Sequence, residues 1–272
     1  MSEKGMLTAL ITGASSGLGA EFVRQLARDG RCAELWLVAR RAEAMAAVVE
    51  AGRREAQLAG RAFPTCRILA LDLCRAEDLA HLEATLAAEK PALGWVVNAA
   101  GFGKFGNWEA VGPDWAERMI ALNVKALVRI TEMCIPYIQN GGRIVEIAST
   151  AAFCPLPGMN VYAASKSFVL FYGRALRREL KSAGRGIGLT VLCPGPVRTD
   201  FWAIGNETYA LKRLGRADAF WMTSAEDVVR HTLRAARRNK AVVTYGFWNS
   251  WHRRLAKCLP WSWIMAFSRK LI

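Results

Sequence analysis

Histidine is scarce in this 272-residue sequence, and paired cysteine is absent. The three histidines lie far apart, and none of the seven cysteines forms a C-x-x-C pair. Zinc ligands recur at short spacings, so we expect no metal site. An odd, unpatterned set of cysteines is typical of a reduced intracellular protein, which predicts a cytoplasmic location. These residues are His81, His231 and His252, and Cys32, Cys66, Cys74, Cys134, Cys154, Cys193 and Cys258.

Long hydrophobic runs are missing as well. The first apolar run, residues 6–11, is too short for a secretion signal and is expected to be a strand. The uncharged stretch between Lys257 and Arg269 has eleven residues, below the ~20 that cross a bilayer. We therefore expect neither secretion nor a transmembrane helix. A hydrophobic content of 53% still provides a large core, and we expect one domain over residues 1–245 and a C-terminal extension over 246–272.

Acidic residues are absent after Asp227, and the whole chain carries a formal charge of +14. Residues 230–272 contain ten Lys or Arg residues and four tryptophans. Interleaved aromatic rings and cations suit peripheral contact with an anionic membrane, but aromatics at a chain end also pack against a second subunit or a neighbouring loop. Both interpretations stay open at this point. No docking motif for nucleic acid accompanies the charge, so we expect no nucleic-acid partner.

The sequence does contain a regular alternation of strand-like and helix-like segments. Apolar runs predict strands buried on both faces, and amphipathic stretches predict the helices between them. We expect an α/β, doubly wound Rossmann fold: a mostly parallel seven-stranded sheet with helices on both faces. Strands are expected over 6–12, 34–39, 66–72, 93–98, 143–149 and 186–193. Helices are expected over 18–29, 41–59, 76–89, 114–139 and 162–182, with Gly141 and Gly142 ending the fourth.

A glycine-rich turn joins the first expected strand to the first expected helix. The pattern T-G-x3-G-x-G occupies residues 12–19. Where side chains are missing, backbone N–H groups can approach a pyrophosphate at the helix N-terminus. We therefore predict a dinucleotide site in this turn. Its residues are Gly13, Ser15, Ser16, Gly17, Leu18 and Gly19.

The end of the second expected strand indicates which dinucleotide binds. In the form that binds NAD, an acidic residue there accepts hydrogen bonds from the ribose 2′-hydroxyl. This strand instead ends in Val38-Ala39-Arg40-Arg41. An arginine at this place can pair with a 2′-phosphate through charge-assisted hydrogen bonds. We predict NADP(H) as the cofactor, with Arg40 as the residue that recognises it. For Arg41 a solvated place at the helix start is the alternative.

A second pattern places a phenol, an ammonium group and a hydroxyl at defined spacings. Lys166 follows Tyr162 at i+4, so both side chains lie on one face of a helix, and Ser149 precedes Tyr162 by thirteen residues. A positive charge at ~4 Å, at an effective dielectric of ~20, lowers the pKa of a tyrosine by ~3 units from ~10. We expect Lys166 to make Tyr162 an efficient proton donor and acceptor near neutral pH.

Seven motifs follow one another between residues 12 and 199. They are T-G-x3-G-x-G at 12–19, Asp72-Leu73, N-A-A-G at 98–101, Asn123, Ser149, Y-x3-K at 162–166, and P-G at 194–195 with Thr199. In this combination the sequence resembles the short-chain dehydrogenase/reductase family. Ala99 departs from the family pattern, which often has a second asparagine there, while Asn98 remains.

The resemblance implies a role for each matched residue. Tyr162 would be the general acid or base, Ser149 would hydrogen-bond the substrate oxygen, and Lys166 would lower the Tyr162 pKa and hold the nicotinamide ribose. Asn123 would anchor a water beside Lys166 and complete the catalytic set. The implied cofactor contacts, beyond the glycine turn and Arg40, are Asp72, Leu73, Asn98, Gly101, Tyr162, Lys166, Pro194, Gly195, Val197 and Thr199.

The resemblance also implies an NADPH-dependent carbonyl reductase or alcohol dehydrogenase that forms a dimer or tetramer. A substrate lid is expected over about residues 200–224, and its large apolar side chains favour a hydrophobic ketone or secondary alcohol. Two alternatives are a non-catalytic dinucleotide-binding sensor and a membrane-associated binding protein on the same fold. The expected lid residues are Phe201, Trp202, Ala203, Ile204, Tyr209, Leu211, Phe220, Trp221 and Met222, with Phe102, Phe105, Phe153 and Met159 on the same wall.

Overall fold

A seven-stranded sheet forms the centre of the computed structural model, which describes residues 7–201 and 222–268. The strand order is β3-β2-β1-β4-β5-β6-β9, and every adjacent pair is parallel. The order reverses between β1 and β4, which is where ligands bind in doubly wound folds. The strands are β1 (Leu7–Thr12), β2 (Cys32–Ala39), β3 (Thr65–Ala70), β4 (Leu93–Asn98), β5 (Ile138–Ile147), β6 (Gly188–Leu192) and β9 (Val242–Val243).

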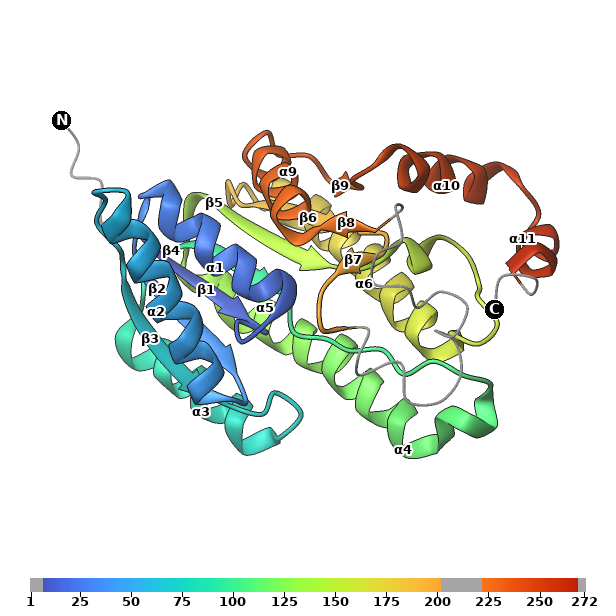
Figure 1. Cartoon of the computed structure of the whole chain (residues 1–272), viewed down its shortest axis with the longest axis horizontal. Helices are drawn as coiled ribbons and strands as arrows, with labels where there is room; N and C mark the ends of the chain where they lie inside the picture. The colour runs from blue at the N-terminus through green and yellow to red at the C-terminus, as the bar shows by residue number, and fades with distance from the viewer. Residues whose placement is uncertain (1–6, 202–221, 269–272) are drawn as a thin grey trace.

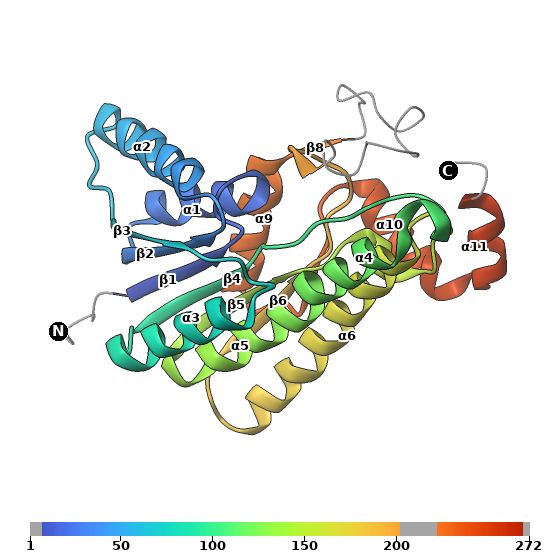
Figure 2. The same ribbon diagram turned by 90° about the horizontal axis from the view of Figure 1, so that it is seen from below.

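Helices cover both faces of the sheet, because the central strands are apolar on both sides. One face carries α1 (Gly17–Asp29), α2 (Ala42–Leu58) and α9 (Ala225–Arg237) (Figure 2). The opposite face carries α3 (Ala76–Glu89), α4 (Trp108–Ile120), α5 (Leu127–Cys134) and α6 (Asn160–Ser182). Two buried apolar clusters, one on each side of the sheet, result from this arrangement. The predicted doubly wound α/β fold is confirmed, with a sheet that is parallel throughout its described ladders.

The helix expected over 114–139 is divided into several parts. It starts earlier, as α4, because the Asn107 side chain caps it by accepting the Ala110 N–H at 2.9 Å. A π-helical segment (Ala121–Ala126) separates α4 from α5, and a 3₁₀ turn (Ile135–Tyr137) containing Pro136 follows α5.

Gly141 and Gly142 do not end this helix, as the sequence had suggested. They lie within β5, which already pairs at Ile138 with Leu93 of β4. The register between β4 and β5 shifts after Leu93, and Gly141 has a φ of +84° in this irregular stretch. The glycines therefore accommodate a local irregularity of a strand rather than a helix end.

The C-terminal extension forms α10 (Phe247–Cys258) and α11 (Trp261–Ser268), which lie at the opposite end of the molecule from α2 and β3 (Figure 1). Helix α10 begins directly after Gly246, whose φ is +93°. Its inner side packs on the chain itself: His252 Nε2 lies 3.7 Å from Cys154 Sγ. Within residues 7–201 and 222–268, no helix is both long and apolar enough to cross a bilayer. The division of the chain at residue 246 stays a prediction.

Candidate active site

The glycine turn is shaped by close backbone contacts. Gly13 has a φ of +66°, and a Cβ atom on it would lie 2.8 Å from the backbone of Ala99 and Ala100. A Cβ on Gly19 would lie 2.1 Å from the Gly13 carbonyl oxygen. Ser16 occupies the N-cap of α1, but its side chain makes no capping hydrogen bond. The first amides of α1 can therefore bind an anionic group, and the turn fits the pyrophosphate of a dinucleotide.

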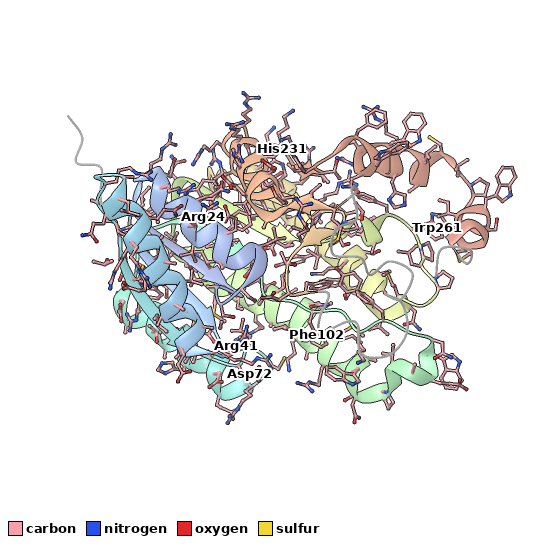
Figure 3. All side chains as sticks on the ribbon, viewed as in Figure 1. Arg24, Arg41, Asp72, Phe102, His231 and Trp261 are labelled. Carbon is pink, nitrogen blue, oxygen red and sulfur yellow. The ribbon has the colours of Figure 1, made fainter. Side chains whose placement is uncertain are left out.

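The two arginines after β2 occupy different places. The Arg41 guanidinium approaches the Ser15 hydroxyl of the glycine turn at 3.5 Å. Arg40 lies near Cys74 instead. Burial and Asp72 raise the pKa of the Cys74 thiol, and the charge of Arg40 opposes this rise. Arg41 and Asp72 lie at the same edge of the fold (Figure 3). Arg41, for which a solvated place was the alternative, is thus the arginine that contacts the glycine turn.

Asp72 and Leu73 form the turn after β3. The Asp72 carboxylate accepts the Cys74 N–H at 3.0 Å, and the backbone N–H of Asp72 donates to the Asp78 carboxylate at 2.8 Å. Leu73 is buried in the core. These bonds hold the turn that lies near Arg40, and the contact of Asp72 with a cofactor stays a prediction.

Ser149, Tyr162 and Lys166 come together at the carboxyl end of β5. Ser149 caps a short 3₁₀ helix (Thr150–Phe153) by accepting the Ala151 N–H at 3.1 Å, and its side chain hydrogen-bonds that of Tyr162. Tyr162 is buried near the start of α6, and the Lys166 ammonium lies 5.9 Å from the centre of its ring. The sequence-predicted catalytic groups therefore share one site.

Asn123 joins this site to the loop after β4. It is fully buried within the π-helical segment, its Nδ2 donates to the Phe102 carbonyl at 2.9 Å and to Ser165 Oγ at 3.1 Å, and its Oδ1 accepts the Phe102 N–H. A Cβ on Gly101 would lie 3.0 Å from Asn123 Oδ1 and 3.2 Å from Lys166 Nζ. Gly101 therefore keeps a narrow space open beside the ammonium.

The electrostatics of Tyr162 differ from the expectation. Burial raises the pKa of Tyr162 to about 12, and the hydrogen bond with Ser149 offsets this only in part. Lys166 donates to the Ile147 carbonyl at 2.9 Å, and burial lowers its own pKa to about 8. The Tyr162 pKa is thus raised in this structure rather than lowered as expected, because burial disfavours the phenolate, and the tuning of Tyr162 by Lys166 stays a prediction.

A buried acid, Glu146, lies near Lys166, one of the predicted catalytic groups. It sits on β5 with no exposed surface, and its Oε1 accepts from Thr131 Oγ1 at 2.8 Å and Asn98 Nδ2 at 3.2 Å. Burial raises its pKa to about 7, whereas the two hydrogen bonds and the Lys166 charge lower it. Sequence reasoning missed this residue, although an acid inside the apolar run 144–147 was a signal. Asn98, an expected cofactor neighbour, braces β4 to β5 through this cluster.

Replacing Glu146 by glutamine should change how stability depends on pH. The folded pKa of about 7 exceeds the ordinary 4.5, so the folded state favours the protonated carboxyl, and this advantage is complete below pH ~4.5 and is lost as pH rises through 7. Glutamine mimics the protonated form, so Glu146→Gln should gain stability relative to wild type between pH 5 and 8, by at most about 3 kcal/mol. Thermal unfolding across this pH range measures it.

The control is Glu83→Gln, which removes an exposed carboxylate paired with Arg129. It should leave the pH dependence close to that of the wild type. A second measurement is the pH profile of activity. Loss of the Glu146 charge should lower the Lys166 pKa further. The alkaline limb of the activity profile should therefore lie at lower pH in Glu146→Gln than in the wild type. Parallel stability curves for Glu146→Gln and wild type would contradict the assignment of a strained buried acid.

An apolar wall surrounds the Tyr162 ring. The Phe105 ring lies 5.5 Å from it and the Phe201 ring 5.8 Å, measured between centroids. Phe102 and Met159 pack against the same cluster, as expected, and Val111, Trp115 and Met119 were missed because they lie on α4, outside every motif. Phe153 is not part of this wall; it packs on His252, with ring centroids 6.0 Å apart. Of the expected lid, residues 202–221 lie outside the described residues.

The remaining predicted cofactor contacts follow β6. Thr199 lies against the glycine turn, because a Cβ on Gly17 would be 3.4 Å from its side chain. Val197 is buried in the short strand β7 (Val197–Arg198), which pairs with β8 (Thr223–Ser224), and the Pro194 carbonyl accepts the Thr150 N–H at 2.9 Å. A Cβ on Gly195 would lie 2.2 Å from Oδ1 of Asn249 in α10. Gly195 therefore makes room for the C-terminal helix.

The sequence matches the family described as short chain dehydrogenase over residues 7–210. The chain belongs to the short-chain dehydrogenase family. A glycine betaine reductase of Emericella nidulans is 30% identical over 86% of this chain, but the match spans only 18% of that relative's length. Membership of this family accounts for the fold. Among the described residues of this short-chain dehydrogenase, no group of three or more His, Cys, Asp or Glu side chains is placed to hold a metal ion.

Solved structures give the same family. A short-chain dehydrogenase from Sphingobium yanoikuyae in complex with NADPH is 31% identical, with a TM-score of 0.76 over 90% of this chain and 91% of that one. A bulky-bulky ketone specific alcohol dehydrogenase from Comamonas testosteroni is 27% identical, with a TM-score of 0.71 over 93% of both chains. A Burkholderia phymatum relative in complex with NAD, 24% identical and with a TM-score of 0.74, is similar in fold. Both nicotinamide dinucleotides therefore occur among the similar structures.

Proposed function

We propose that this oxidoreductase uses NADPH to reduce a hydrophobic ketone, or in reverse oxidises a secondary alcohol. The observation that carries the proposal is the buried Tyr162 phenol, which hydrogen-bonds Ser149, lies beside Lys166 and faces Phe105 and Phe201. A protonatable group inside an apolar wall suits a carbonyl with large apolar substituents. The glycine turn that fits a pyrophosphate supports the dinucleotide.

Ser149, Tyr162 and Lys166 would each have a separate role in the reduction. Ser149 would hydrogen-bond the carbonyl oxygen, and Tyr162 would deliver its phenolic proton to that oxygen as negative charge develops on it. With its pKa raised to about 12, Tyr162 stays protonated at neutral pH, which suits reduction. Lys166, held by the Ile147 carbonyl, would keep a positive charge beside the site below pH ~8. The bound nicotinamide supplies or accepts the hydride.

The experiment that tests this function is a screen of NADPH oxidation by the whole chain against ketones of increasing apolar bulk. We expect turnover to favour bulky ketones over small ones such as acetone. An absence of turnover over the whole panel, with NADPH binding intact, would support the alternative of a dinucleotide-binding sensor.

Arg41 should determine the preference for NADPH. A charge-assisted bond to a 2′-phosphate contributes roughly 1.5–3 kcal/mol, so Arg41→Ala should raise the KM for NADPH about 10- to 100-fold while hardly changing that for NADH. Arg40→Ala, measured in parallel, shows whether Arg40 shares this role. Arg54, an exposed arginine of α2, provides the control variant Arg54→Ala. Equal efficiency with NADH and NADPH in the wild type would refute the NADP(H) assignment.

We also propose that the chain forms a homo-oligomer through the outer side of α6. Phe168 and Phe171 are 42% and 68% exposed there, and burial against a second copy would remove this apolar surface from water. Sedimentation equilibrium decides the point, because a monomer at all concentrations contradicts it. The cytoplasmic location stays a prediction.

A further inference from the structure

The C-terminal helices concentrate the exposed apolar surface of the molecule. Of the eleven large hydrophobic side chains exposed among the described residues, six lie between residues 247 and 263. Five of them are aromatic, and their exposed fractions run from 46% to 74%. Such a patch marks an interaction site when it is contiguous. We call these five residues the aromatic face: Phe247, Trp248, Trp251, Trp261 and Trp263.

The helical period explains why the aromatic residues of α10 are exposed. In α10, Phe247, Trp248 and Trp251 fall on one side of the helix, and the opposite side carries Asn249, His252, Arg253 and Ala256. These inner residues make the contacts with the rest of the chain. Asn249 donates to the Tyr245 carbonyl, Arg253 donates to that of Val242, and Ala256 is buried. The helix is therefore held in place by one side while its aromatic side faces solvent.

The placement of the aromatic face leaves it accessible. Helices α10 and α11 lie at one end of the molecule, away from α1 and α2, which carry the phosphate-binding side (Figure 1). Trp261 lies at this end as well (Figure 3). An object much larger than a small ligand can therefore reach the aromatic face without covering the glycine turn.

Charge decides which partner fits. Arg254 is exposed on α10, and no acidic residue follows Asp227 in the sequence, whereas residues 230–272 contain ten Lys or Arg. If a second copy packed on this face about a two-fold axis, Arg254 and its neighbours would meet their own equivalents, with no acid of this segment to neutralise them. A surface of negative charge with an apolar layer below it satisfies both the cations and the aromatic rings.

We propose that the aromatic face binds the surface of an anionic phospholipid membrane, with α10 and α11 lying in the interface. Helix α10 has 12 residues and α11 has eight, so each is far shorter than the ~20 residues of a spanning helix. Tryptophan rings suit the headgroup level, and arginines pair with lipid phosphates. This property goes beyond the proposed redox function and does not depend on it.

Co-sedimentation of the full chain with lipid vesicles tests the proposal. Vesicles of phosphatidylcholine alone are compared with vesicles that also contain phosphatidylglycerol, at low and at high salt. We expect binding to the anionic vesicles at low salt, weakened by salt and by omission of phosphatidylglycerol. Trp248→Ala combined with Trp251→Ala should weaken it at least about tenfold, because the variant loses much of the inserted apolar area. Arg254→Ala should weaken it about fivefold, since one basic residue contributes about 1 kcal/mol.

Trp108→Ala provides the matched control, because Trp108 is 73% exposed on α4, outside the aromatic face. It should bind vesicles like the wild type, and thermal unfolding checks that all variants are folded. Failure of the wild type to bind anionic vesicles at low salt would overturn the proposal. So would equal losses in the Trp108 and Trp248/Trp251 variants. A dimer in sedimentation equilibrium that the Trp248/Trp251 variant dissociates, without vesicle binding, would assign the face to a second copy instead.

Discussion

Tyr162→Phe should abolish reduction of a ketone that the wild type turns over, while leaving NADPH binding nearly unchanged. The variant keeps the ring that packs between Phe105 and Phe201 and removes only the hydroxyl that hydrogen-bonds Ser149. General acid catalysis by a positioned group contributes about 10²- to 10⁴-fold, so kcat should fall by at least this factor. Steady-state kinetics and titration of NADPH binding by fluorescence measure the two quantities separately.

Tyr172→Phe is a suitable control for this experiment. Tyr172 lies on the same helix, and its buried hydroxyl has no hydrogen-bond partner among the described residues. Its removal should leave kcat within about twofold and be neutral for stability or slightly favourable. If Tyr162→Phe kept most of the activity, Tyr162 would not be the proton donor, whatever the substrate.

Gly19→Ala should weaken NADPH binding by at least about a hundredfold. Its Cβ would lie 2.1 Å from the Gly13 carbonyl oxygen, so the start of α1 and the glycine turn must move apart. The first amides of α1 then leave the positions in which they can donate to a pyrophosphate, and both their hydrogen bonds and the helix dipole act at reduced strength. Calorimetric titration with NADPH gives the affinity directly.

Gly60→Ala separates this effect from a general loss of stability. Gly60 also has a positive φ, +62°, but a Cβ there meets nothing within 4 Å. The change should cost roughly 1 kcal/mol of stability through backbone strain and leave NADPH affinity unchanged. Should Gly19→Ala bind NADPH as the wild type does while melting at a similar temperature, the glycine turn is not the phosphate site.

The sequence was sufficient for the features that depend on local spacing. The glycine turn lies between β1 and α1 as expected, and Tyr162 and Lys166 share one side of α6 because their four-residue separation is a helical period. The end of β5 brings Ser149 to them because parallel strands end at one edge of the sheet. Motif residues were therefore placed well by elementary geometry.

Features that depend on tertiary surroundings could not be predicted in this way. The pKa of Tyr162 follows from the depth of its burial, and the partners of Glu146 come from β4 and α5, which are distant in sequence. The direction of the Arg41 side chain toward Ser15 depends on how α2 leaves the sheet. In each case a spacing along the chain carried no information about the dielectric surroundings or the direction of a side chain.

The contacts of α10 with the rest of the chain join two segments that are distant in sequence. Asn249 fills the space that Gly195 leaves, and His252 rests on Cys154 and Phe153, so one helix touches both the segment after Ser149 and the segment after β6. Helix α10 therefore connects two segments that border the predicted active site. Removal of residues 247–272 would break this connection and loosen both segments, even though every predicted catalytic residue would still be present.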